Sequence, residues 1–447
     1  MGQRIRFLGQ PGATLLTDRR MGEFESLAAD WLSYEEALAH VLNEASPMPT
    51  ARVPAWSAFG RSLAEPIRAR ADLPAWPNSA MDGFAVRSED LAAAATTPVT
   101  LPVQGASYPG SVPLEKVPPG AVVRIMTGGA VPAGFDTVIR VEHTDGEASP
   151  GWVVIHRTDD LGRHVRSAGK DMTAGEETVP EGAIVHSGSV PVILASGQDP
   201  VAVYRRPRVG VLSSGDELVG PERFDRVVEG RAVPDTNRAM IAAGVREAGG
   251  VPVDLGVVDD DPESLGNSLD SLPDVDVLVT TGGASMGEKD LLKRILLNMP
   301  FRLGFWRVRV RPGSPISFGH LRRGDHDLPV FGLPGNPASA FVTFHVFVAP
   351  YMRACLGSPR PGGTPVVVCT DAPLASPEGL TQFYRVTLHG PPNDGGSRWA
   401  RCSLTGPQGS GLVRSLRDAE GLAVIPEGVA RIQRNEPVSV MLLPGPR

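Results

Sequence analysis

The chain has 447 residues, of which 41% are hydrophobic, and its formal net charge is −7 at pH 7. A chain of this length corresponds to about three domains that can each bury a core. Its negative charge argues against a protein whose main role is to coat nucleic acid or an anionic membrane. Only four of the 43 basic residues are lysines, so we expect arginine wherever a site needs positive charge.

The cysteine content and the hydropathy pattern indicate the cellular setting. The three cysteines show no CxxC spacing, which disfavours both a disulfide framework and a structural zinc site. No stretch offers the roughly 20 uninterrupted apolar residues of a bilayer span, and the first 20 residues lack the apolar core of a signal peptide. We therefore expect a cytoplasmic protein that binds neither membrane nor nucleic acid.

The first predicted elements are a helix and a β-rich module. Ser33, with Glu36 three residues later, fits a capping box at the start of a helix that continues through residue 45. Residues 67–161 consist of short Val/Ile runs cut by Pro and Gly, a pattern typical of strands. Residues 165–203 also look β-rich.

Strands and helices alternate between residues 206 and 360. Apolar runs at 209–212, 253–258, 275–280 and 329–333 are separated or followed by helical patterns at 237–248, 262–272, 291–299 and 337–356. This alternation predicts a doubly wound parallel sheet with helices on both faces. After a Pro/Gly linker, residues 361–447 return to β runs, which predict a terminal β-sandwich or small barrel.

Three loops follow predicted parallel strands of the α/β region, at the edge where such sheets bind ligands. They are Ser213–Glu217, Thr280–Ser285 and Gly332–Ser339. Their glycines allow close approach of backbone N–H groups, and helix N-termini favour anions. One such loop alone could be only a tight turn, but three at one edge favour a site for a phosphate-bearing small molecule.

Arg307, Arg309 and Arg311 alternate with Val308 and Val310. An extended strand would place the three guanidinium groups on one face, where they could bind phosphate or a tetrahedral oxyanion. The alternative is a solvated edge strand that its charges protect from aggregation.

Carboxylates gather near several predicted turns, and hard oxygen ligands beside bound phosphate are what Mg²⁺ uses. Taken singly, each fits a helix cap or an Asx turn, Asp259 and Asp261 above all. The nine histidines are scattered, so nucleophilic catalysis by a Ser-His-Asp arrangement is not expected. The carboxylates are Asp82, Asp171, Glu217, Asp235, Asp259, Asp260, Asp261 and Asp290.

Nine sequence blocks, in this order, resemble the molybdopterin molybdenumtransferases and the corresponding domain of gephyrin-like proteins. Taken one by one they are weak signals, but together they extend over residues 32–445. The blocks are PNSAMDGFAV (77–86), IMTGGAVPAGFDTVI (125–139), GKDM (169–172), VGVLSSGDEL (209–218), PDTN (234–237), DDDP (259–262), TTGGASMGEKD (280–290), RPGSP (311–315) and GLPGNPASA (332–340).

The resemblance implies a multidomain homodimer with a central MogA-like α/β domain that binds molybdopterin. The implied divisions are an N-terminal tail (1–28), an elongated connecting domain (29–66 plus 162–205), a β-rich module with the NSAMDG turn (67–161), the α/β domain (206–360) and a C-terminal β domain (361–447). The implied reaction inserts molybdate into adenylylated molybdopterin, with Mg²⁺ present and AMP released. Possible partners are a molybdopterin adenylyltransferase and other proteins of cofactor biosynthesis.

The resemblance also implies roles for individual residues. The implied catalytic residues are Asp82, Thr127, Asp171, Glu217, Asp260 and Asp290, of which Asp82, Glu217, Asp260 and Asp290 are candidate Mg²⁺ ligands. Molybdate or phosphate would be bound by Arg307, Arg311 and Ser314. The pterin would be bound by Ser214, Gly215, Gly282, Gly283, Ser285, Pro334, Gly335, Asn336 and Pro337.

Three positions depart from the pattern of the family: Pro77 stands where Asp is common, Phe84 where Tyr is common, and Ser314 where a second lysine is common. The change at Ser314 removes a cation, although Arg307 and Arg311 keep positive charge with a different geometry. Two other functions stay open. One is a molybdopterin adenylyltransferase, which shares the GGxS block, and the other is a non-catalytic scaffold that binds the cofactor.

Overall fold

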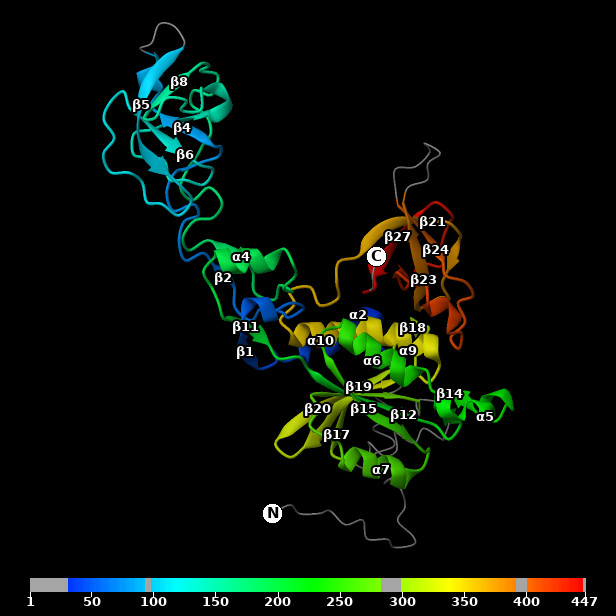
Figure 1. Cartoon of the computed structure of the whole chain (residues 1–447). Coiled ribbons are helices and arrows are strands. Elements are labelled where there is room, and N and C mark those ends of the chain that lie inside the picture. Colours follow the sequence, from blue (N-terminus) through cyan, green and yellow to red (C-terminus); the bar gives the residue numbers. More distant parts are fainter. Residues whose placement is uncertain (1–30, 93–97, 283–298, 391–399, 445–447) are drawn as a thin grey trace. The chain divides into compact units, whose positions relative to one another are not determined.

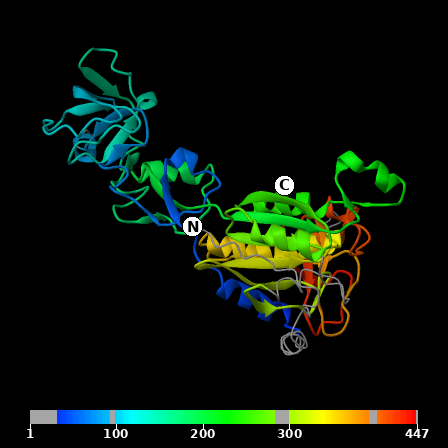
Figure 2. The ribbon, with the colours of Figure 1, turned by 90° about the horizontal axis from the view of Figure 1, so that it is seen from below.

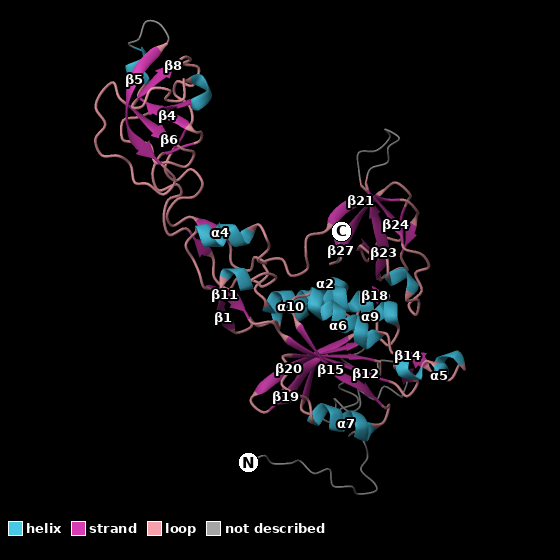
Figure 3. Cartoon of the chain, viewed as in Figure 1, coloured by secondary structure: helices cyan, strands magenta, loops and turns pink. Residues whose placement is uncertain are grey.

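The computed structural model describes residues 31–92, 98–282, 299–390 and 400–444. Its internal contacts divide the chain into two compact units: residues 52–203 form one, and residues 1–51 with 204–447 form the other. Helices are concentrated around one sheet of the second unit, whereas residues 52–203 consist mainly of strands and loops (Figures 1 and 3). The finer domain boundaries expected from the sequence stay a prediction.

A six-stranded sheet in the order β15-β12-β16-β20-β19-β17 is the centre of the larger unit. The neighbours β15, β12, β16 and β20 are parallel, as predicted, whereas β19 and β17 are antiparallel and were not predicted. The strands are β12 (Arg208–Ser214), β15 (Val251–Val258), β16 (Val277–Thr281), β17 (Phe301–Phe305), β19 (Ser317–Arg323) and β20 (His326–Leu333).

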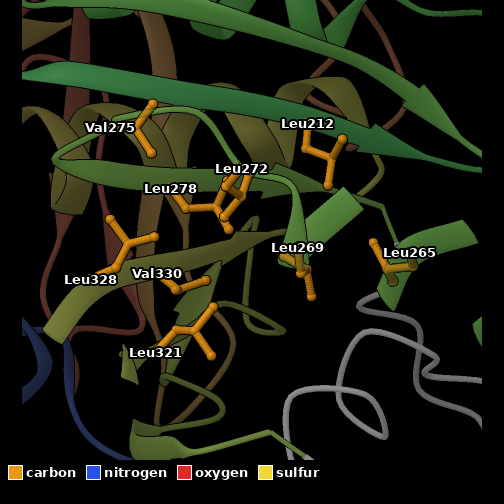
Figure 4. Close-up of a cluster of buried hydrophobic side chains, with 9 residues drawn as sticks. All are labelled: Leu212, Leu265, Leu269, Leu272, Val275, Leu278, Leu321, Leu328 and Val330. Atoms are coloured by element: carbon orange, nitrogen blue, oxygen red, sulfur yellow. The ribbon is translucent and has the colours of Figure 1, made fainter. Parts of the chain in front are cut away.

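Helices cover both faces of this sheet, which confirms the doubly wound prediction. One face carries α7 (Pro262–Asp270), whose Leu265 and Leu269 pack into a cluster with Leu278 and Val330 of the strands (Figure 4). The opposite face carries α6 (Asn237–Glu247), α9 (Pro337–Thr343), a π-helical segment (Phe344–Val348) and α10 (Ala349–Cys355) (Figure 1). The helix predicted at 291–299 falls outside the described residues apart from Met299.

Helix α2 (Tyr34–Asn43) begins with the predicted capping box. The Ser33 Oγ accepts from the Glu36 N–H at 3.1 Å, and the Glu36 carboxylate accepts from the Ser33 N–H at 2.8 Å. The Tyr34 ring lies 5.7 Å from that of Phe347, and Figure 2 shows this blue helix beside the yellow helices. These contacts pack α2 against the helices of the α/β domain.

The C-terminal strands form a second sheet in the order β18-β23-β24-β21-β27-β25. Because β25 also pairs with β23, five of these strands close into a barrel, which decides between the two predicted architectures. A short pair of β22 (Leu374–Ala375) and β26 (Arg431–Ile432) lies outside this sheet. The strands of the sheet are β18 (Val310–Arg311), β21 (Val366–Thr370), β23 (Thr381–His389), β24 (Arg401–Leu404), β25 (Gly421–Ile425) and β27 (Pro437–Leu442).

The unit of residues 52–203 contains the predicted β-rich module. Its five-stranded sheet has the order β7-β4-β6-β5-β8 and buries Phe84, Ile139 and Ile155. The module also contains α3 (Ser88–Ala92) and a short pair of β3 (Asn78–Ser79) with β9 (Val165–Arg166). The strands of the sheet are β4 (Gly83–Val86), β5 (Val99–Ser107), β6 (Val122–Ile125), β7 (Thr137–Arg140) and β8 (Trp152–Ile155).

The rest of this unit packs around Leu63, Ile193 and Val203. Here β1 (Thr50–Val53) pairs with β11 (Val201–Tyr204), and β2 (Ile67–Arg68) pairs with β10 (Glu177–Val179). Residues 165–203 are not β throughout, because α4 (Ser189–Ala195) turns Ile193 into this core. In the described parts of both units, no helix is long and apolar enough to cross a bilayer.

Candidate functional site

The described parts of the three predicted loops lie side by side at one edge of the six-stranded sheet, because the parallel strands before them are neighbours. Ser214 ends β12, and its Oγ contacts the carboxylate of Asp260, which follows β15. The Asp260 N–H donates to Asp216 Oδ1 at 2.9 Å, and the Gly215 N–H donates to the Val258 carbonyl at 3.2 Å. Residues of the SGDE and DDDP blocks therefore contact each other directly.

Two glycines bring the second and third loops against the first. Gly282 has a φ of +90°, and a Cβ there would lie 2.2 Å from the Ser214 carbonyl oxygen. A Cβ on Gly335 would lie 3.6 Å from the Gly282 Cα. Only a glycine fits at 282 in this conformation, so the described backbones of the three loops approach one another closely. Gly283 and Ser285, also expected here, fall outside the described residues.

The Gly335-Asn336 turn is held from two sides. The Asn237 Nδ2 donates to the Gly335 carbonyl at 2.6 Å. On the other side, Ser410 of the C-terminal domain accepts from the Ala338 N–H at 2.9 Å and from the Asn336 Nδ2 at 3.3 Å. Sequence reasoning noted the block that contains Asn237 without assigning it a role, and no local signal marks Ser410. Of the other residues expected at this turn, Pro334 is buried and Pro337 begins α9.

Arg385 is a buried cation that sequence reasoning missed. Its side chain is 0% exposed, and its Nε donates to Ser415 Oγ at 3.0 Å while its Nη2 donates to the Gly409 carbonyl at 3.4 Å. Its Nη1 has no partner, and no carboxylate of the described residues pairs with it. Burial lowers the pKa of this guanidinium. The sequence feature that could have indicated this buried cation is an arginine in the middle of an apolar strand.

The expectation that residues 307–311 form one extended strand is wrong. Strand β18 covers only Val310 and Arg311, because the Val310 N–H bonds to the Val308 carbonyl at 2.8 Å. The two valines are nevertheless fully buried while the arginines are not. Arg309 is neutralised by Glu427, 3.0 Å from its Nε.

The arginines on either side of Arg309 keep different environments. The Arg307 guanidinium lies 5.6 Å from the Trp31 ring centroid, and its Nε is buried without a partner. Arg311 is exposed and forms no ion pair with the described residues. Ser314 uses its Oγ to donate to the Val310 carbonyl at 2.5 Å.

The carboxylates of the α/β domain divide into structural and free groups. Asp261 is the N-cap of α7, as predicted, and accepts from the N–H groups of Glu263 and Ser264. Asp235 is also structural, because it accepts from Ser213 Oγ and pairs with Arg238.

Asp216, Glu217, Asp259 and Asp260 are exposed at the strand edge. Asp259, expected with Asp261 to start the helix, does not cap α7, because Asp261 is its N-cap. Within the described residues no three His, Cys, Asp or Glu side chains converge as a metal cluster. Asp290 falls outside the described residues.

A polar cavity of about 370 Å³ adjoins the SGDE loop. Gly215, Asp216 and Asp259 line it from the strand edge, and Arg223, Arg226 and Arg238 line it from the segment that follows. Mixed charges of this kind suit a ligand that is polar as well as anionic.

Asp82 belongs to the other unit, where it follows β3 and precedes β4. Its Oδ1 accepts from the Thr127 N–H at 2.6 Å and from the Thr127 Oγ1 at 2.8 Å. These two bonds, the backbone one foremost, hold the pKa of Asp82 below its usual value. Both residues are exposed, so the turn presents a carboxylate that stays ionised. Asp171 is also exposed, and its N–H donates to the Leu73 carbonyl at 2.9 Å.

The parts of the chain described above match three known family models. Residues 210–354 match the model of the probable molybdopterin binding domain. Residues 32–197 match the MoeA N-terminal region (domains I and II), and residues 368–443 match the MoeA C-terminal region (domain IV).

Whole-chain comparisons agree with these matches. A molybdopterin molybdenumtransferase from a Nostoc species is 33% identical over 416 residues, which cover 89% of this chain and 90% of that protein. Molybdopterin molybdenumtransferase 2 of Mycobacterium tuberculosis is also 33% identical, over 89% of this chain and 96% of its own length. The crystal structure of a molybdopterin biosynthesis MoeA protein from Pyrococcus horikoshii superposes with a TM-score of 0.74 at 29% identity, covering 93% of this chain and all of that one.

The chain therefore belongs to the molybdopterin molybdenumtransferase (MoeA) family, and it is a transferase of molybdenum cofactor biosynthesis. The matches on both sides of the α/β domain favour this family over the adenylyltransferase alternative.

Proposed function

We propose that this chain inserts molybdate into adenylylated molybdopterin and releases AMP in a Mg²⁺-dependent reaction. The observation that carries the proposal is the convergence of three glycine-containing loops at one strand edge, with the Gly335-Asn336 turn held by Asn237 and Ser410. Loops of this kind expose backbone N–H groups to an anionic ligand. We assign the pterin to this edge, to Ser214, Gly215, Gly282, Gly283, Ser285, Pro334, Gly335, Asn336 and Pro337.

Positive charge near the edge would stabilise the anions of the reaction. Arg311 is free to contact solvent or ligand, while the half-buried Arg307 and the buried Arg385 act through their potential. In a site from which water is excluded, such fixed charges stabilise developing negative charge without reorganising. We assign molybdate or phosphate to the neighbourhood of Arg307, Arg311 and Ser314.

The donor set of the edge fits Mg²⁺. Mg²⁺ keeps several waters and usually takes one or two protein carboxylates together with substrate phosphate, and Glu217 and Asp260 are exposed carboxylates on neighbouring strand ends. The Ser214 hydroxyl orients Asp260. When bound, Mg²⁺ would neutralise phosphate charge and so make AMP a better leaving group. Asp82 and Asp290 stay further candidate ligands.

Asp82 and Thr127 would contribute a fixed, ionised carboxylate that orients a reacting oxygen. Asp171 is a further candidate from the same unit. The homodimer, the cytoplasmic location and a partner adenylyltransferase are proposals that rest on membership of the family.

The proposal is tested by supplying purified protein with two alternative substrate pairs. Adenylylated molybdopterin with molybdate and Mg²⁺ should give AMP and molybdenum cofactor. Molybdopterin with ATP should give no adenylylated product. Product only from the second pair would identify an adenylyltransferase, and binding without product from either pair would identify a scaffold.

A further inference from the structure

A buried carboxylate in the β-rich module joins segments that are distant in the sequence. Asp160 is 1% exposed, and its two oxygens each lie 3.1 Å from the Nε of Arg140. Asp160 Oδ2 also accepts from the Arg140 N–H at 3.1 Å. The Nε2 of His164 lies 3.1 Å from Oδ1, and the Nδ1 of His143 lies 2.9 Å from Oδ2.

The residues that Asp160 holds are bonded to the backbone of the NSAMDG turn. Arg140 lies opposite Gly83 in the β7–β4 pair, and the next N–H, that of Val141, donates to the Asp82 carbonyl at 3.0 Å. At the other end of the turn, the Ala80 N–H donates to the His164 carbonyl at 2.8 Å. One carboxylate thus fixes both segments against which Ala80 and Asp82 are bonded.

The electrostatics of this cluster keep the carboxylate charged. Burial alone would raise the pKa of Asp160, but the hydrogen bonds from Arg140 and His164 outweigh it and hold the pKa well below its usual range. Glu142 and Asp159 are the nearby acidic groups that act on Arg140. A buried charge with several donors is costly to disrupt, because each donor would be left unpaired.

We propose that Asp160 is a positioning residue for Asp82: it clamps the end of β7 and the His164 segment, and so fixes the NSAMDG turn in the orientation in which Asp82 acts. The inference rests on the proposed function, since the role of Asp82 in turnover is itself proposed. It assigns Asp160 no contact with substrate.

Asp160→Asn in the full chain tests this inference through two independent readouts. Amide hydrogen exchange at Ala80 and Val141 should accelerate by about tenfold, because the segments that they bond to lose their anchor. The kcat for AMP release should fall by about tenfold or more while KM changes little, because misplacement affects the reaction more than binding.

Asp145→Asn is the matched control in the same module. Asp145 Oδ1 also accepts from backbone N–H groups, those of Val154 at 2.9 Å and Glu147 at 3.1 Å, yet this turn is not bonded to NSAMDG. We expect faster exchange at Val154 with no change at Ala80, at Val141 or in kcat. Unchanged exchange at Ala80 and Val141 in Asp160→Asn, or a kcat no lower than that of Asp145→Asn, would overturn the inference.

A milder variant covers the case in which Asp160→Asn does not fold. His164 has a φ of +67°, which Asn adopts more readily than most residues, so His164→Asn removes only the imidazole contact. This variant should accelerate amide exchange at Ala80 more than at Val141. Exchange rates at both residues equal to those of wild type would contradict the proposed positioning role of Asp160. If wild type releases no AMP, the exchange data still decide the role of Asp160, and only the proposed function fails.

Discussion

Asp82 Oδ1 receives both hydrogen-bond donors of Thr127, the N–H at 2.6 Å and the hydroxyl at 2.8 Å. The two residues are 45 positions apart in the sequence and lie in the NSAMDG and IMTGGA blocks. This contact joins the two blocks: the second supplies the donors that orient the carboxylate of the first.

Thr127→Val should raise the pKa of Asp82, because the hydroxyl bond is lost while the larger backbone contribution remains. A carboxyl group with a depressed pKa stays ionised to lower pH, so the variant should lose activity at a higher pH than wild type on the acid side. An NMR titration of the Asp82 carboxyl carbon measures the shift. Thr127→Ser, which keeps the hydroxyl, should titrate like wild type, and an identical pKa in Thr127→Val would contradict this reading.

The variants Gly282→Ala and Gly335→Ala distinguish a glycine that close backbone packing requires from a glycine that only ligand approach requires. The first places a Cβ 2.2 Å from the Ser214 carbonyl at a φ of +90°, whereas the second meets only the Gly282 Cα at 3.6 Å. Gly282→Ala should lower the free energy of unfolding by about 2 kcal/mol or more, and Gly335→Ala should change it by about 0.5 kcal/mol or less. Denaturant unfolding checks both values, and equal effects would show that the edge can relax around a side chain.

Gly335→Ala should nevertheless weaken pterin binding several-fold, because Gly335 is exposed and the new methyl group would stand between its turn and the Gly282 loop. Equilibrium binding of molybdopterin measures this effect. Wild-type affinity in a folded Gly335→Ala variant would move the pterin away from this turn.

Asp260→Asn should increase the Mg²⁺ concentration needed for half-maximal AMP release several-fold, since it removes one charged oxygen from the candidate metal site. The neighbouring Asp261→Asn is the matched control: Asn keeps an oxygen that can accept from the N–H groups at the start of α7, so Tm should change little and the Mg²⁺ requirement should not change. If both variants respond alike to Mg²⁺, Asp260 is not a metal ligand.

Arg311→Gln should raise the molybdate concentration for half-maximal rate several-fold, because Arg311 is exposed and forms no ion pair with the described residues. Arg309→Gln serves as its control, since Arg309 is engaged by Glu427. That partly exposed pair contributes about 1 kcal/mol or less to stability, and its loss should leave the molybdate dependence unchanged. The opposite pattern would assign oxyanion binding to Arg309.

Features with local causes could be predicted from the sequence. The capping box of Ser33 and Glu36 and the N-cap at Asp261 involve residues within three positions of each other. The alternation of strand and helix patterns, which is also a local feature, predicted the parallel strands and the three loops at their ends.

Features with long-range causes could not be predicted. The Arg309 N–H bonds to the Leu32 carbonyl at 2.8 Å, so a segment 277 positions away helps to decide the backbone of the arginine stretch. The antiparallel strands β17 and β19 pair with each other, although residues 306–316 separate them in the sequence. These intervening residues contain the arginine pattern, which indicated a different strand. Ser410 reaches the Asn336 turn from another domain, and no pattern near either residue indicates this contact.

The most direct test of the central claim is AMP release from adenylylated molybdopterin by the purified full-length chain in the presence of Mg²⁺, with and without molybdate. The account predicts AMP in amounts that rise with molybdate, with molybdenum cofactor formed in equal quantity. Absence of AMP above a protein-free control, or AMP release that molybdate does not affect, would contradict it.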